Sequence, residues 1–145
     1  MATMTGHHAP NAGEPRVQTL IVEDEPTVAT SLKALLAMEG HEVTIAGDVQ
    51  VARRLLWSRP FDLLVLDLLL PDGDGMELLR ELKHDPDLAR LAVIVVTATR
   101  PEEAAREALS LGAIEYLEKP FNPMQLVTAV RQALAPAAPD SPATR

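Results

Sequence analysis

Short apolar segments alternate with amphipathic segments along most of this chain. Five segments are rich in aliphatic and β-branched residues, and they cover residues 19–22, 42–46, 63–66, 92–96 and 114–117. The first, third and fourth are apolar throughout rather than at every second position, which is typical of strands covered on both faces. The pattern therefore predicts five β-strands in a sheet with helices on both sides.

Between these segments, apolar residues recur at the spacing of an α-helix. Proline stands at first-turn positions (Pro26, Pro101 and Pro123), and Gly40 and Gly112 follow helical segments as left-handed caps. Five helices are predicted. Their recurring apolar residues are Val28, Leu32, Leu35 and Leu36, then Ala52, Leu55 and Leu56, then Leu78, Leu79 and Leu82, then Ala104, Ala105, Ala108 and Leu109, and finally Leu126, Val130 and Leu134.

Five strand–helix units with short connections predict one α/β domain with a parallel sheet and right-handed crossovers. In such sheets, ligands bind beyond the carboxyl ends of the strands, where the strand order reverses. The domain is expected over residues 17–135. Residues 1–16 are predicted to be a disordered N-terminal tail, and the Pro/Ala-rich residues 136–145 a disordered tail or linker.

Composition narrows the functional classes. The 145 residues suffice for one domain, and with 47% hydrophobic but only 3% aromatic residues the core must be aliphatic. A formal net charge of −8 repels phosphate backbones, so no nucleic-acid binding is expected of this chain itself. There is no cysteine, no signal peptide in the first 16 residues and no apolar run long enough for a membrane span. A cytoplasmic domain without membrane contact is the expectation.

Four of the predicted strands end in polar residues. Glu23 and Asp24 follow the first strand, Asp67 the third, Thr97 the fourth and Lys119 the fifth. In a parallel sheet these ends converge, and two carboxylates 4–5 Å apart repel by roughly 3–4 kcal/mol at an effective dielectric near 20. A cation must offset three carboxylates, and oxygen-only ligands on short loops favour Mg²⁺.

Four motifs in this order resemble the response-regulator receiver domains of bacterial two-component signalling. They are VEDE (22–25), LLVLDLLLPDGDG (63–75), VIVVTAT (93–99) and IEYLEKPF (114–121), and the resemblance covers roughly residues 17–135. It implies a single three-layer, flavodoxin-like (βα)5 domain with the parallel strand order 2-1-3-4-5. It also implies a cis peptide bond between Lys119 and Pro120.

The resemblance implies a role for each residue at these strand ends. Asp67 corresponds to the phosphoacceptor. Asp24 and Asp67 would be direct Mg²⁺ ligands, Glu23 would act largely through water, and the backbone carbonyl of Leu69 would supply a further oxygen. The phosphoryl donor would be a sensor histidine kinase or a phosphotransfer protein, with acetyl phosphate as a small substitute.

Three further residues correspond to the phosphoryl-binding and switch positions of the family. Lys119 would bind a phosphoryl oxygen, and the Thr97 hydroxyl would bind another once phosphate is present. Tyr116 matches the switch aromatic, whose rotamer follows Thr97. The protein would then pass between two states and present a changed surface to a downstream protein target.

Other interpretations of these residues remain open. Acids before Pro26 are ordinary at a helix start, Thr97 is a common strand terminator, and Tyr116 packs in many proteins without switching. Asp72 and Asp74 lie in a turn, where turn formation and helix capping explain them better than metal binding.

Two departures from the family pattern change the expectations. Leu69 stands where some receivers carry an amide or acid that orients the hydrolytic water, so a long-lived phosphoryl group is predicted. Ile114 and Ala129 replace charges that one receiver subfamily uses to dimerise. A phosphorylation-dependent homodimer therefore has no face assigned by the sequence.

Three functions compete. The first is a phosphorylatable switch that is no enzyme beyond its own phosphoryl transfer and slow autodephosphorylation. The second is a receiver-like scaffold that is never phosphorylated. The third, an aspartyl-nucleophile phosphatase, ranks last because Leu68 and Leu69 follow Asp67. The output is either a stand-alone regulator or a receiver cut from a longer, DNA-binding transcriptional regulator.

Overall fold

The computed structural model describes residues 16–98 and 102–135. Within these ranges, five strands form one parallel sheet in the order β2-β1-β3-β6-β7. This order is the predicted 2-1-3-4-5 arrangement, which is thereby confirmed. The strands are β1 (Val17–Val22), β2 (His41–Ala46), β3 (Leu63–Leu66), β6 (Ala92–Thr97) and β7 (Glu115–Glu118).

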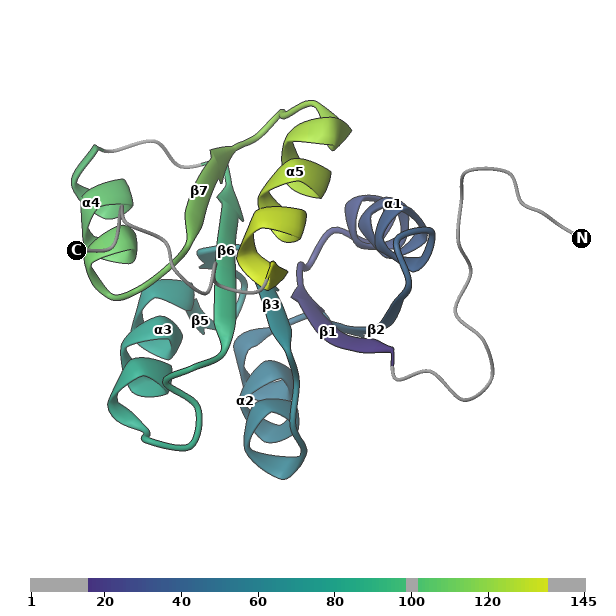
Figure 1. The fold of residues 1–145 in the computed structure, drawn as a ribbon. Coiled ribbons are helices and arrows are strands. Elements are labelled where there is room, and N and C mark those ends of the chain that lie inside the picture. The colour runs from purple at the N-terminus through teal and green to yellow at the C-terminus, as the bar shows by residue number, and fades with distance from the viewer. Residues whose placement is uncertain (1–15, 99–101, 136–145) are drawn as a thin grey trace, which may run out of the picture.

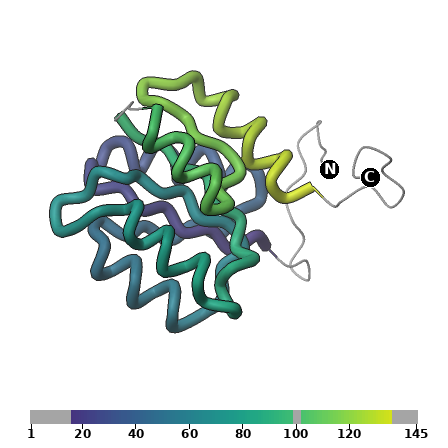
Figure 2. The backbone as a smooth tube through the Cα atoms, turned by 90° about the vertical axis from the view of Figure 1, so that its left-hand side faces the viewer, coloured from purple at the N-terminus to yellow at the C-terminus, as the bar shows by residue number. Residues whose placement is uncertain are grey.

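Helices cover both faces of the sheet (Figure 1). Helices α1 and α5 lie on one face, and α2, α3 and α4 lie on the other, with α2 and α3 side by side in the turned view of Figure 2. The helices of the described residues are α1 (Pro26–Ala37), α2 (Val49–Ser58), α3 (Gly75–His84), α4 (Glu102–Ser110) and α5 (Pro123–Leu134).

Successive strand residues pack into two different clusters, which explains why the central strands are apolar throughout. Leu64 belongs to the cluster on the α2–α4 side, whereas Leu63 and Val65 belong to the cluster on the α1–α5 side. All three side chains are fully buried. A strand with two covered faces needs apolar residues at every position, because neighbouring side chains point to opposite faces.

The predicted helix boundaries agree where the structure describes them. Pro26 and Pro123 are the first residues of α1 and α5. Gly40 and Gly112 have φ angles of 90° and 105°, the left-handed conformation in which glycine avoids a Cβ clash. The prediction for Pro101, like the tails at residues 1–15 and 136–145, lies outside the described residues.

One element of the structure is not predicted by the sequence pattern. A two-stranded antiparallel hairpin, β4 (Leu69–Leu70) and β5 (Gly73–Asp74), follows β3 and leads directly into α3. Two-residue strands are too short for a hydrophobic period to identify them. Among the described residues, no helix combines the length and the apolar character that a bilayer span requires.

A buried histidine at the amino end of the sheet predicts a pH-dependent stability. His41 is 4% exposed, and its Nδ1 lies 2.7 Å from the Thr19 hydroxyl. Burial lowers the pKa of His41 below its ordinary value, and the charges of Glu39 and Asp62 offset this only in part. The unfolded chain takes up a proton near pH 6.5 that the folded chain resists. The neutral His41 therefore costs the folded state nothing above about pH 6.5, and the free energy of unfolding decreases as the pH falls below that value.

We expect the free energy of unfolding to fall between about pH 7 and pH 5.5, and the fall to be smaller in His41→Gln. Urea unfolding at several pH values measures it. The matched control is His84→Gln, at an exposed position on α3. An equal pH dependence in His41→Gln and wild type would show that His41 is not responsible.

Candidate functional site

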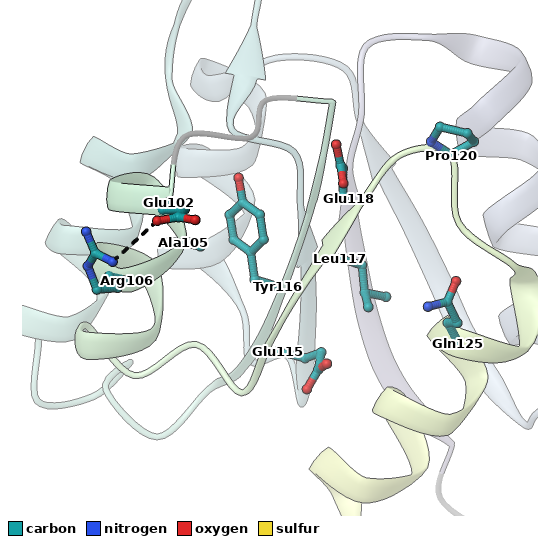
Figure 3. Close-up of a pocket in the computed structure, with 9 residues that line it drawn as sticks. All are labelled: Glu102, Ala105, Arg106, Glu115, Tyr116, Leu117, Glu118, Pro120 and Gln125. Atoms are coloured by element: carbon teal, nitrogen blue, oxygen red, sulfur yellow. Dashed lines mark ion pairs between the residues drawn. The ribbon is translucent and has the colours of Figure 1, made fainter.

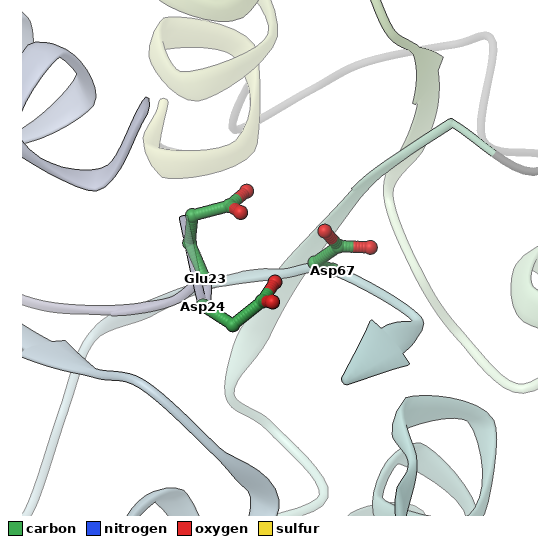
Figure 4. Close-up of side chains that lie close together, drawn as sticks. All are labelled: Glu23, Asp24 and Asp67. Atoms are coloured by element: carbon green, nitrogen blue, oxygen red, sulfur yellow. The ribbon is translucent and has the colours of Figure 1, made fainter. Parts of the chain in front are cut away.

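Three carboxylates meet at the carboxyl ends of β1 and β3. The two strands are neighbours, with Val22 paired to Leu66, so the residues that follow them emerge at the same level of the sheet. One carboxylate oxygen from each of Glu23, Asp24 and Asp67 lies within 4.8 Å of the others, and Figure 4 shows the group beside the strand ends. Chain topology thus assembles a cluster from segments more than 40 residues apart.

Backbone hydrogen bonds fix these strand ends. The Asp67 N–H donates to the Val22 carbonyl at 3.0 Å, and the Glu23 N–H donates to the Ala46 carbonyl at 3.0 Å. Glu23 and Asp67 are buried, with 2% and 4% of their surface exposed, whereas Asp24 is exposed to solvent. The cluster therefore has a dry inner part and an open side.

Lys119 joins the cluster from the carboxyl end of β7. Its Nζ donates to Glu23 Oε1 at 2.5 Å and to Asp67 Oδ2 at 3.0 Å. Burial by itself lowers the pKa of Lys119, but the hydrogen bonds and charges of Glu23 and Asp67 raise it above its ordinary value. The lysine is therefore an ammonium group at neutral pH. The peptide bond between Lys119 and Pro120 is cis.

The charges of this cluster do not balance. Among the described residues, one ammonium group faces the three clustered carboxylates, which leaves a formal excess of two negative charges. An all-oxygen donor set with one open side fits a hard divalent cation such as Mg²⁺, which retains some of its water. The residues at this position are chemically suited to hold such an ion.

Thr97 and Tyr116 lie on the two strands beyond β3. Thr97 ends β6 and is fully buried, and its carbonyl accepts a hydrogen bond from the Lys119 N–H at 2.9 Å. Tyr116 pairs with Val95 across β6 and β7 and packs partly buried against the core on the α2–α4 side. Figure 3 shows its ring beside α4, with the ion pair between Glu102 and Arg106 nearby.

The segment after Asp67 packs very closely against the acidic cluster. The Leu69 N–H donates to Asp67 Oδ1 at 3.0 Å, while the Leu69 side chain is 56% exposed. A Cβ at Gly75 would lie 2.7 Å from the Asp67 carbonyl oxygen and 2.8 Å from Leu68 Cα. Glycine at position 75 is therefore required for the chain to turn back against the strand end.

Asp72 and Asp74 both cap helices. Asp74 is the N-cap of α3 and accepts from the Met76 N–H at 2.9 Å, as the sequence predicts. Asp72 instead caps a different helix, since its carboxylate accepts from the N–H groups of Val49 and Gln50 at the start of α2. This contact could not be predicted from local sequence, because Asp72 is 23 positions from Val49 and 22 positions from Gln50.

This chain is similar to response regulators, in sequence and in structure. The family model of the response regulator receiver domain matches residues 19–131. The chain is 36% identical over 115 residues to the phosphate regulon transcriptional regulatory protein PhoB of Pseudomonas aeruginosa, which covers 79% of this chain and 50% of that protein. The chain spans about half the length of the curated PhoB relatives that it matches.

Solved structures are similar over most of the chain. A CheY-like receiver domain protein of Methanospirillum hungatei superposes with a TM-score of 0.76 and 30% identity, over 81% of this chain and 93% of that one. The Mn²⁺-bound form of the response regulator Rcp1 gives a TM-score of 0.74 and 28% identity, over 87% of this chain and all of that one. The chain belongs to the response regulator receiver family of two-component signalling, in which phosphorylation by a kinase is general.

Proposed function

We propose that this domain is a phosphorylation switch whose phosphoacceptor is Asp67. The observation that carries the proposal is the joint position of Asp67 between the acidic pair and Lys119, at the carboxyl edge of the sheet. An ordinary solvated acid at a helix start would not be buried against a lysine 96 positions away in the chain, as Glu23 is, and the same lysine also binds Asp67. A sensor histidine kinase or a phosphotransfer protein is the proposed donor, and the proposed compartment is the cytoplasm.

Mg²⁺ is the proposed cofactor. Asp24, Asp67 and the Leu69 carbonyl would hold it directly, with Glu23 acting through water. The excess of negative charge in the cluster supports a divalent ion, and the related regulator Rcp1 has been crystallised with Mn²⁺. When bound, the ion supplies neutralisation of the charge on the transferred phosphoryl group.

The side chains of this protein supply the rest of the reaction. An Asp67 carboxylate oxygen forms a bond to phosphorus while the bond from phosphorus to the donor's imidazole nitrogen breaks, and the electron pair of that bond stays on the nitrogen. Lys119 gives up its hydrogen bond to Asp67 and donates instead to a phosphoryl oxygen. The buried Thr97 hydroxyl binds another, and Tyr116 moves with it as the switch aromatic.

A protein donor is supported by an apolar groove that opens beside the cluster. Lys119 is one of its lining residues, and the groove holds about 660 Å³ between α1 and the segment that leads from β7 into α5. A helix carrying the phosphohistidine would bury an apolar face there while the imidazole reaches Asp67. The apolar lining consists mainly of Val28, Leu32, Leu35, Phe121 and Pro123.

Acetyl phosphate tests the proposed function without knowledge of the kinase. The protein is incubated with acetyl phosphate and Mg²⁺, and intact-mass spectrometry measures the increase in mass. We expect one phosphoryl group per chain, and none when EDTA removes the metal. An unchanged mass, with a receiver of known activity phosphorylated in parallel, would favour the scaffold interpretation.

The exposed leucine beside the site predicts a slow loss of phosphate. An apolar side chain at position 69 cannot orient an attacking water. Leu69→Asn keeps the backbone carbonyl but adds a polar group, and we expect it to shorten the lifetime of the phosphoprotein by about tenfold. Decay is followed by mass spectrometry after removal of acetyl phosphate, with Leu69→Val as the apolar control. A wild-type lifetime of seconds, or no difference between the variants, would refute this role of Leu69.

The output is proposed to be a change in protein binding. The match to half of a named transcriptional regulator favours a second candidate, namely the receiver part of a DNA-binding regulator. A dimer held by charge pairs finds little support, because Ala129 is only 4% exposed and Ile114 presents an apolar side chain that is 47% exposed. Sedimentation of the phosphorylated and unphosphorylated chain distinguishes a homodimer from a surface for another protein.

A further inference from the structure

The β4–β5 hairpin is held from two sides. On one side, the Asp72 carboxylate accepts from the backbone N–H groups of Val49 at 2.7 Å and Gln50 at 3.1 Å. These are the first two residues of α2, where a negative charge interacts favourably with the helix dipole. Gly73 also packs here, since a Cβ on it would lie 3.2 Å from Val49 Cγ2. The hairpin turn is therefore attached to the amino end of α2.

On the other side, the same hairpin contacts the acidic cluster. The Leu69 N–H donates to Asp67 Oδ1, and the Gly75 N–H donates to the Leu68 carbonyl at 3.0 Å. Leu69 pairs with Asp74 in the hairpin, so the turn that carries Asp72 lies between two paired residues. The hairpin therefore lies between the contact that Asp72 makes with α2 and the contact that Leu69 makes with Asp67.

We propose that Asp72 is a positioning residue for the metal site. By fixing the hairpin to α2, it sets the place of Leu69, whose carbonyl would bind the ion and whose N–H orients the Asp67 carboxylate. This inference rests on the proposed function. Mg²⁺ demands near-ideal octahedral geometry at about 2.0–2.1 Å, so a small displacement of one ligand weakens binding.

A matched control separates positioning from charge and from helix stability. Asp48 is the N-cap of α2 and accepts from the Val51 N–H at 2.8 Å, but it belongs to α2 rather than to the hairpin. Asp48→Ala removes one carboxylate and one cap from the same helix end. Asp72→Ala does the same and in addition releases the hairpin.

The first measurement is calorimetric titration of the unphosphorylated full chain with Mg²⁺. We expect Asp72→Ala to raise the Kd by about tenfold, as loss of a supporting contact does at other metal sites, and Asp48→Ala to stay close to wild type. Asp72→Asn, which keeps one oxygen acceptor, should lie between them. Equal weakening in Asp72→Ala and Asp48→Ala, or no weakening in Asp72→Ala, would overturn the inference. A wild-type chain that does not bind Mg²⁺ would overturn the metal site itself.

The second measurement does not involve the metal. Amide hydrogen exchange in EDTA should show faster exchange at residues 69–74 in Asp72→Ala than in wild type, with the core strands unchanged. If Asp72→Ala does not fold, the same comparison is made with Asp72→Asn. Unchanged exchange in the hairpin of a folded variant would show that Asp72 does not hold it.

Discussion

Asp67→Asn is expected to eliminate the Mg²⁺-dependent gain of a phosphoryl group from acetyl phosphate. The substitution keeps the shape of the side chain and an oxygen that accepts from the Leu69 N–H, but it removes the nucleophilic carboxylate. Intact-mass spectrometry of the treated protein measures the loss.

The control for this experiment is Asp87→Asn, at an exposed position between α3 and β6, which should be phosphorylated like wild type. The exposed Asp24 is the alternative acceptor to exclude. Peptide mapping of trapped phosphoprotein decides between the two aspartates. Undiminished phosphorylation of Asp67→Asn would mean that Asp67 is not the acceptor.

Lys119→Met is expected to lower the free energy of unfolding in EDTA by about 3 kcal/mol, because it leaves two buried carboxylates without their cation. The value is taken at the lower end of the range for broken buried ion pairs, since the lysine side chain is 20% exposed. Urea unfolding at neutral pH measures it. Mg²⁺ should recover part of the loss, because it restores positive charge to the cluster.

Two variants test the electrostatic origin of this loss. The double substitution Lys119→Met/Glu23→Gln should be more stable than Lys119→Met, since one uncompensated charge has been removed. Arg131→Met breaks the surface pair with Glu39, whose arginine side chain is 63% exposed, and should cost less than about 1 kcal/mol. If Lys119→Met lowered the free energy of unfolding as little as Arg131→Met does, Lys119 would not be needed to stabilise the buried carboxylates.

The sheet could be predicted from the sequence because its central strands are covered on both faces. Leu63 to Leu66 have no polar residue, so their role was unambiguous. The start of β1 was missed by two residues, because Val17 and Gln18 lie at the partly exposed end of the strand. There the hydrophobic pattern no longer reflects burial.

The membership of the acidic cluster followed from strand order, which brings the residues after β1 and β3 together. The contacts that hold the β4–β5 hairpin could not be predicted from the sequence. Leu68, Leu69 and Leu70 look alike in sequence, yet Leu68 is 4% exposed and Leu69 is 56% exposed. The sequence predicts turn formation and helix capping for Asp72 and Asp74, but local preferences carry no information about the distant start of α2 that Asp72 caps.

The bond between Lys119 and Glu23 joins positions 96 residues apart, so it closes a loop that contains nearly the whole domain. Closing a loop of this length has a large entropy cost unless the intervening chain is already ordered. An incomplete chain on the ribosome, or a product cleaved ahead of β7, retains Asp67 but lacks the lysine that completes its surroundings. Under the proposed function, competence to receive phosphate would be tied to completion of the fold, and copies truncated before β7 would compete poorly for phosphate.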